Sequence, residues 1–111
     1  MNQDTVDIII KTLSNFRSIK ADITAAQVIT YLTIATKEGG VTNGDIEELL
    51  DIKQVAASRN LRTFDYGETQ RNKGLGLADT MMSRDTQNLK IRVPSPDGVT
   101  FIKELEEIIG K

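Results

Sequence analysis

The segment from Val41 to Phe64, VTNGDIEELLDIKQVAASRNLRTF, carries the strongest structural signal in the chain. Thr42 or Asn43 can cap a first short helix, because a short side-chain oxygen accepts a free N–H of the opening turn. Negative charges follow close to that turn, where they suit the positive end of the helix dipole. Asp51 can begin a second helix after a tight break. The segment therefore predicts two short helices joined by a turn.

Apolar residues recur at helical spacing in this segment, so one face of each helix is expected to meet a core. These residues are Ile46, Leu49 and Leu50 in the first helix, Ile52 between the helices, and Ala57, Leu61 and Phe64 in the second. The side chains left outside on the second helix are polar: Lys53, Gln54, Ser58, Arg59 and Arg62. The pattern is typical of a helix-turn-helix, whose second helix enters the major groove of DNA.

Two further helices are predicted before this segment. Residues Thr5 to Ile19 form an amphipathic helix, whose apolar stripe comprises Val6, Ile9, Ile10, Leu13 and Phe16. A second helix begins near Thr24, which can cap it, and stops at the glycine pair that starts with Gly39, since glycine accepts the left-handed conformation that ends helices. Its expected inward-facing residues are Val28, Leu32 and Ala35.

The chain after Phe64 predicts a polar loop, a hairpin and a closing helix. The two strand candidates are residues 77–82 and 89–93, with a turn at Ser83 to Asn88 between them. The second strand alternates strictly, which directs Leu89, Ile91 and Val93 to the core and Lys90 and Arg92 to solvent. The closing helix has an expected buried face made of Val99, Ile102, Leu105 and Ile109. The fold class is mostly α (α+β), a winged helix-turn-helix with a two-stranded β-wing, in one domain spanning residues 1–111.

Two stretches resemble the MarR type of bacterial winged-helix repressor. LDIKQVAASRNL (Leu50 to Leu61) is similar to its recognition helix, and Gly74 to Leu105 looks like its β-wing followed by the closing helix, with an S-x-x-G motif at Ser95 to Gly98. The resemblance implies a dimer built from the terminal helices and a ligand cleft between them and the DNA-binding part. The wing departs from the family pattern. In that pattern, Arg usually stands two residues after an Asp, whereas here Gln87 stands two residues after Asp85.

Composition argues against catalysis and against a membrane protein. The chain has no His and no Cys, so the commonest general base, thiolate nucleophiles and the usual transition-metal ligands are missing. Gly74-Leu75-Gly76 lacks the context of a nucleotide-binding loop. No apolar run approaches the length of a membrane span. We expect a cytoplasmic protein that is not an enzyme and holds no metal or cofactor, although an effector molecule is compatible with the resemblance.

Charge is distributed unevenly along the chain. The net charge is −2, with 14 Lys and Arg against 16 Asp and Glu. Residues Lys53 to Arg92 hold eight of the basic and four of the acidic residues, which makes this segment +4 and the remainder −6. A solvated surface with chance clustering is the alternative interpretation. The excess nevertheless coincides with the predicted recognition helix and wing, where DNA phosphates would be met.

Individual DNA contacts follow from side-chain chemistry. Gln54 can pair with adenine and Arg59 with guanine, each through two hydrogen bonds. Val55 suits a thymine methyl group, and packing against the preceding helix is an equal alternative. The remaining candidates are assigned to phosphates and to the minor groove: Lys53, Ser58, Arg62 and Thr63 on or beside the recognition helix, and Arg84, Lys90 and Arg92 in the wing.

Together these features predict a dimeric, sequence-specific repressor that binds a palindromic site on double-stranded DNA. The expected dimer contacts are the N-terminal stripe listed above and Ile102, Leu105 and Ile109. The alternative for both stripes is that they close the core of a monomer. Two other functions stay open on the sequence: a winged-helix module that binds protein, and a DNA-binding protein of replication, partition or packaging.

Overall fold

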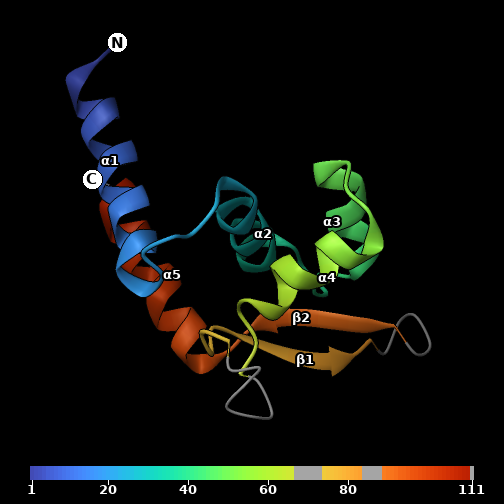
Figure 1. Ribbon diagram of the computed structural model, residues 1–111. Helices are drawn as coiled ribbons and strands as arrows, with labels where there is room; N and C mark the ends of the chain where they lie inside the picture. Colours follow the sequence, from blue (N-terminus) through green and yellow to red (C-terminus); the bar gives the residue numbers. More distant parts are fainter. Residues whose placement is uncertain (67–73, 84–88, 111) are drawn as a thin grey trace.

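The computed structural model describes residues 1–66, 74–83 and 89–110. Its elements follow the predicted order: α1 (Gln3–Ile19), α2 (Ala25–Thr36), α3 (Asn43–Leu50), α4 (Gln54–Arg62), β1 (Ala78–Met82), β2 (Lys90–Pro94) and α5 (Pro96–Ile109). In Figure 1, α3 and α4 lie at one end of the molecule with the hairpin beneath them, and α1 and α5 run side by side at the other. The winged helix-turn-helix is confirmed. No helix in the described ranges has the length and apolarity needed to cross a membrane.

Short polar side chains set the start of most helices. Thr24 and Thr42 each form a capping box, in which the threonine accepts an N–H three residues on and that residue's side chain accepts the threonine N–H. Asn2 caps α1 and accepts from two amides, which starts this helix two residues before the predicted Thr5. The prediction that Asp51 begins α4 is wrong. Asp51 ends α3 in the left-handed conformation, with φ 53°, a region that Asp tolerates better than most residues.

The core is centred on aromatic side chains from four parts of the chain. Tyr31 of α2 has no exposed surface and lies 4.8 Å from the ring of Phe64 and 5.8 Å from that of Phe101. Phe16 of α1 packs edge-on against Phe101 of α5 at 5.2 Å. Such edge-to-face contacts add to the free energy gained from burial alone. The aromatic cluster therefore joins the terminal helices to the end of α4.

The predicted inward faces of α2 and α5 are partly wrong. On α2 the buried residues are Thr30, Tyr31 and Ile34, whereas Leu32 is 38% exposed. This helix is apolar on several sides, so the 3.6-residue period does not identify one face. On α5 the largest buried side chains are Phe101 and Leu105, while the predicted Val99 and Ile109 are exposed. Leu49 of α3 is exposed as well, although Ala57, Leu61 and Phe64 are fully buried as predicted.

The β1–β2 hairpin, here called the wing, is antiparallel, with Thr80 opposite Arg92. The strands begin one residue later than predicted, and residues 84–88 of the predicted turn lie outside the described residues. Two isolated bridges attach the wing to the helix-turn-helix. Val41 and Arg92 exchange backbone hydrogen bonds of 3.0 and 2.9 Å just before α3, and Asp65 pairs with Ala78 just after α4. The wing is thus connected to both ends of the helix-turn-helix.

The S-x-x-G motif has a structural explanation at the start of α5. Ser95 is fully buried, accepts the N–H of Gly98 at 3.0 Å and donates its hydroxyl to the carbonyl of Gly76 at 2.8 Å. The Tyr31 hydroxyl donates to the carbonyl of Leu77 at 3.0 Å beside it. A Cβ atom on Gly98 would lie 2.1 Å from that carbonyl oxygen and 2.5 Å from the Tyr31 hydroxyl. Only glycine fits at this position.

Replacing Gly98 by alanine is therefore expected to destabilise the fold by about 3 kcal/mol, because backbone must shift and the Tyr31 hydrogen bond is strained. Urea unfolding followed by circular dichroism measures the change. Gly44→Ala is the matched control, since the nearest atom to its added Cβ is 3.8 Å away. Alanine in that helical position should stabilise the protein by about 0.5 kcal/mol. Equal stabilities of the two variants would contradict this account of the motif.

Candidate nucleic-acid interface

The outer face of α4 carries three exposed side chains at helical spacing. Val55, Arg59 and Arg62 stand at positions i, i+4 and i+7, which lie on one side of an α-helix. Val55 is 61% exposed, so its alternative assignment to packing against α3 is wrong. An apolar side chain followed along the helix by two guanidinium groups offers a methyl contact and two sets of forked donors, groups that can contact base edges in a major groove.

Lys53 and Gln54 are exposed at the N-terminal end of the same helix. Lys53 is the N-cap residue of α4, and its side chain makes no capping hydrogen bond. The Gln54 side chain stands in the first turn, where the free N–H groups and the positive end of the helix dipole attract anions. Both residues therefore lie exposed at the N-terminal end of α4, and their assignment to DNA stays a prediction.

Ser58 does not present a free hydroxyl for a phosphate. Its Oγ donates to Asn43 Oδ1 at 2.9 Å, which links α4 to the first residue of α3. The Asn43 amide donates in turn to the Gln54 carbonyl at 3.3 Å and to Glu47 Oε2 at 3.0 Å. The assignment of Ser58 to DNA is corrected accordingly, because its donor is already used within the protein.

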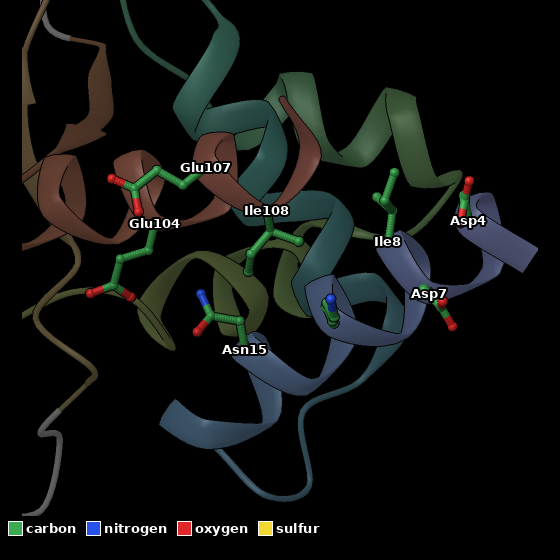
Figure 2. A pocket seen from close by; sticks show the side chains of 8 residues that line it. Asp4, Asp7, Ile8, Asn15, Glu104, Glu107 and Ile108 are labelled. Atoms are coloured by element: carbon green, nitrogen blue, oxygen red, sulfur yellow. The ribbon is translucent and has the colours of Figure 1, made fainter. Parts of the chain in front are cut away.

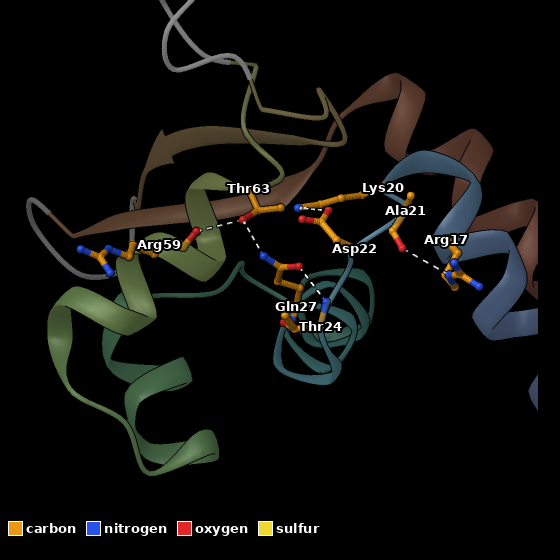
Figure 3. Close-up of polar contacts among 8 residues, drawn as sticks. All are labelled: Arg17, Lys20, Ala21, Asp22, Thr24, Gln27, Arg59 and Thr63. Atoms are coloured by element: carbon orange, nitrogen blue, oxygen red, sulfur yellow. Dashed lines mark hydrogen bonds and ion pairs between the residues drawn. The ribbon is translucent and has the colours of Figure 1, made fainter.

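Thr63 is likewise engaged within the protein. Its hydroxyl donates to the Arg59 carbonyl at 3.0 Å and accepts from Gln27 Nε2 at 3.4 Å. Figure 3 shows this chain of contacts, with the Arg59 side chain extending away from Gln27 and Thr63. Gln27 also accepts the N–H of Thr24 at 2.9 Å, so it joins the start of α2 to the end of α4. The predicted phosphate contact from Thr63 is therefore replaced by a structural role.

Arg92 was expected in solvent and is instead paired. Its guanidinium donates to Asp65 through Nη2 at 3.2 Å and Nε at 3.5 Å, and the two side chains are only 12% and 18% exposed. Asp65 also accepts from Thr80 at 3.4 Å. This ion pair holds β2 against the end of α4 and neutralises one positive charge of the wing. Lys90 remains exposed, and Arg84 lies outside the described residues.

Sequence reasoning missed Asn43, Asp65 and Gln27 as residues that position this surface. Asn43 was considered as a cap, but Thr42 takes that role. Asp65 counted only as an acid in the charge balance, and its partner is 27 residues away. A second ion pair joins Lys37 to Asp45 at the entry to α3. Burial alone would raise the pKa of Asp45, but hydrogen bonds from Lys37 and Thr42 outweigh it and lower that pKa.

The apolar stripes of the terminal helices divide into an inner and an outer set. Phe16 and Leu105 are buried in the core, so neither can touch a partner and their assignment to a dimer contact is corrected. Val6 and Ile102 are half-buried. The exposed members are Ile9, Ile10, Leu13 and Ile109, each at least 44% exposed. The terminal helices therefore both close the monomer and leave an apolar outer surface.

A cavity of about 620 Å³ lies between α1 and α5 (Figure 2). Its lining is predominantly acidic and comprises Asp4, Asp7, Ile8, Lys11, Asn15, Glu104, Glu107 and Ile108. Four carboxylates against one ammonium group repel DNA phosphates, so this cavity is not part of the nucleic-acid surface. The lining residues do not define a ligand class, and the effector suggested by resemblance stays a prediction.

Known proteins resemble this chain in structure. Staphylococcus aureus MepR bound to DNA superposes with a TM-score of 0.66 at 19% identity over 96% of this chain and 78% of that chain. A MarR variant from E. coli complexed with operator DNA gives a TM-score of 0.60 at 15% identity over 93% and 69%. RV1404 from Mycobacterium tuberculosis gives 0.65 at 14% identity over 90% and 62%.

Sequence comparison adds nothing to this structural likeness, since no family model and no curated protein matches the chain. At the identities above, the superpositions establish the fold. The chain has the winged-helix fold of the MarR-type transcription regulators.

Proposed function

We propose that this protein is a sequence-specific, double-stranded-DNA-binding transcription regulator that acts as a homodimer in the cytoplasm and performs no catalysis. The observation that carries the proposal is the exposed Val55, Arg59 and Arg62 face on α4, in a fold whose solved examples include complexes with DNA. A helix in this position enters the major groove, and arginines on its outer face can contact guanine edges or phosphates.

The distribution of charge supports the same surface. The described part of the segment from Lys53 to Arg92 contains α4 and the wing, which lie together at one end of the molecule (Figure 1). Its five basic and two acidic residues give a net charge of +3: Lys53, Arg59, Arg62, Lys90 and Arg92 against Asp65 and Asp79. Pairing of Arg92 with Asp65 removes one cation and one anion from that sum and leaves its sign unchanged. An overall acidic protein can bind DNA in this way, because phosphates respond to the charge that is near them within roughly 10 Å at moderate salt.

The apolar outer surface of the terminal helices supports the dimer. Ile9, Ile10 and Leu13 of α1 and Ile109 of α5 are exposed. In Figure 1 these two helices run side by side at the end of the molecule opposite α3 and α4. Two copies joined there would each direct an α4 helix outward, and a pair of recognition helices can bind two half-sites of a palindrome. A single helix contacts too few base pairs to locate a site in a genome.

Arg59 and Arg62 are assigned different parts in DNA binding, and alanine variants test the assignment. On a duplex enriched from a random pool, Arg59→Ala should cost roughly 1–3 kcal/mol of binding free energy and relax the base preference at one position of each half-site. Arg62→Ala should weaken binding to every duplex alike and reduce the slope of log affinity against log salt by about one unit. Fluorescence anisotropy over a salt series measures both.

Lys103→Ala is the matched control, because it removes an exposed cation from α5, outside the proposed surface. Its affinity and salt slope should equal those of the wild type. Unchanged DNA affinity in both arginine variants would contradict the assignment of α4. The main alternative is that the winged helix binds a protein in place of DNA. In that case the protein should show no preference among duplexes, and its affinity for the protein partner should depend only weakly on salt.

The dimer is tested with Leu13→Asp, which places a carboxylate on the exposed side of α1 and leaves the core intact. The dimer dissociation constant should rise by a factor on the order of 30 or more, because burying an unpaired charge in an apolar contact costs about 2 kcal/mol or more. Leu32→Asp on α2 is the control, since Leu32 is 38% exposed and Leu13 is 46% exposed. Sedimentation equilibrium that finds the same dimer in both variants would refute the proposed interface.

A further inference from the structure

We propose that Asn43 is a positioning residue that fixes the orientation of α4 and thereby the base preference of the protein. This inference rests on the proposed function. Asn43 is the first residue of α3, and its side-chain amide is half-buried between α3 and α4. It is not on the outer face of α4 and is assigned no DNA contact.

The amide of Asn43 uses both of its polar atoms. Oδ1 accepts from Ser58 Oγ at 2.9 Å, and Nδ2 donates to the Gln54 carbonyl at 3.3 Å and to Glu47 Oε2 at 3.0 Å. Gln54 begins α4 and Ser58 lies one turn further on, so two points on the helix are attached to one side chain. Two attachment points restrain rotation of a helix about its axis, which a single apolar contact does not.

Apolar packing differs between the two halves of α4. Leu61 is fully buried under the C-terminal half, whereas the fully buried side chain of the N-terminal half is the small Ala57. The N-cap Lys53 supplies no side-chain hydrogen bond, and its backbone carbonyl accepts only the ordinary first-turn bond from Ala57 at 3.0 Å. The hydrogen bonds from Asn43 therefore provide the directional restraint on the N-terminal half of α4.

Rotation of α4 affects specific and non-specific binding differently. Hydrogen bonds to base edges need each side chain in one place, whereas phosphate contacts tolerate small displacements. If only a fraction of molecules hold α4 correctly, the apparent affinity for the specific duplex falls by that fraction. Binding to random duplex is much less affected. Loss of Asn43 should thus lower the ratio of specific to non-specific affinity.

The test compares Asn43→Ala with Glu47→Ala by anisotropy on the enriched duplex and on a scrambled duplex. Asn43→Ala should lower the specific-to-non-specific ratio at least about fivefold, the effect expected when hydrogen bonds that restrain the helix are lost. Glu47→Ala removes only the bond within α3, so its ratio should equal that of the wild type. The Thr42 cap and its bonds to Asp45 remain in both variants.

Two further measurements separate positioning from general destabilisation. Circular dichroism and thermal melting should show Asn43→Ala folded at the temperature of the binding assay. Ser58→Ala removes the partner hydroxyl alone, and its effect on the ratio should not add to that of Asn43→Ala in the double variant. Should Asn43→Ala fail to fold, Ser58→Ala carries the test, with a lowered ratio expected.

An Asn43→Ala protein that folds and keeps the wild-type ratio of specific to non-specific affinity would overturn the inference and leave the proposed function intact. If Asn43→Ala does not fold, an unchanged ratio in Ser58→Ala would have the same consequence. A wild-type protein that binds the two duplexes equally would refute the proposed function and, with it, this inference.

Discussion

The buried side chain of Tyr31 connects the parts of this molecule that have to act together. Its ring contacts Phe16 of α1, Phe64 at the end of the helix-turn-helix and Phe101 of α5, and its hydroxyl donates to the carbonyl of Leu77 at the start of the wing. Burial raises the pKa of this phenol well above its usual range, so the hydroxyl remains a donor. Gly98 is required beside it because any side chain there would displace both groups.

This arrangement separates two tasks within a small domain. Aromatic packing fixes how the terminal helices stand relative to the helix-turn-helix, and polar contacts fix how α4 is rotated within it. Gln27 attaches the end of α4 to α2, Asn43 attaches its beginning to α3, and the Asp65–Arg92 pair attaches the wing. Removing either member of that ion pair would leave a poorly solvated charge, which is more costly than losing an exposed pair. Polar contacts with α2, with α3 and with the wing therefore fix the position of the surface proposed for DNA.

Local signals in the sequence predicted the fold well. Threonine caps and the spacing of Ala57, Leu61 and Phe64 are patterns of a few residues each, and they identified the helix-turn-helix. Alternation identified the second strand of the wing, but its assignment of inward and outward side chains was partly wrong, because Leu89 is 43% exposed and Arg92 is paired with Asp65. The inward face of α2 was predicted incorrectly because this helix carries apolar residues on several of its sides, so the helical period does not identify the buried side. The stripes of α1 and α5 were identified, but spacing could not divide Phe16, which is buried, from Leu13, which is exposed.

The candidate site was predicted less completely, because partners distant in sequence decide which polar groups are free. Ser58, Thr63 and Arg92 have the right chemistry for phosphates, and each makes a hydrogen bond with a residue that is distant in sequence: Asn43, Gln27 and Asp65. The bond from Thr63 to the Arg59 carbonyl is local. Arg59 and Arg62 have the exposure that the helical period predicted, and Val55, for which the sequence left packing against α3 as an equal alternative, is exposed as well. Among the described residues, the proposed DNA surface thus comprises the outer face of α4, its first turn, and Lys90 of the wing. The assignment of Arg84, which lies outside the described residues, stays a prediction.

Selection from a pool of random duplex DNA, followed by sequencing, tests the central claim most directly. A homodimer that presents two α4 helices should enrich a pair of inverted half-sites whose centres lie about 10 base pairs, one helical turn, or a multiple of that distance apart. An enriched motif without two-fold symmetry would contradict the dimeric arrangement. A pool that stays random through successive rounds at moderate salt would contradict the proposal that this protein recognises a DNA sequence.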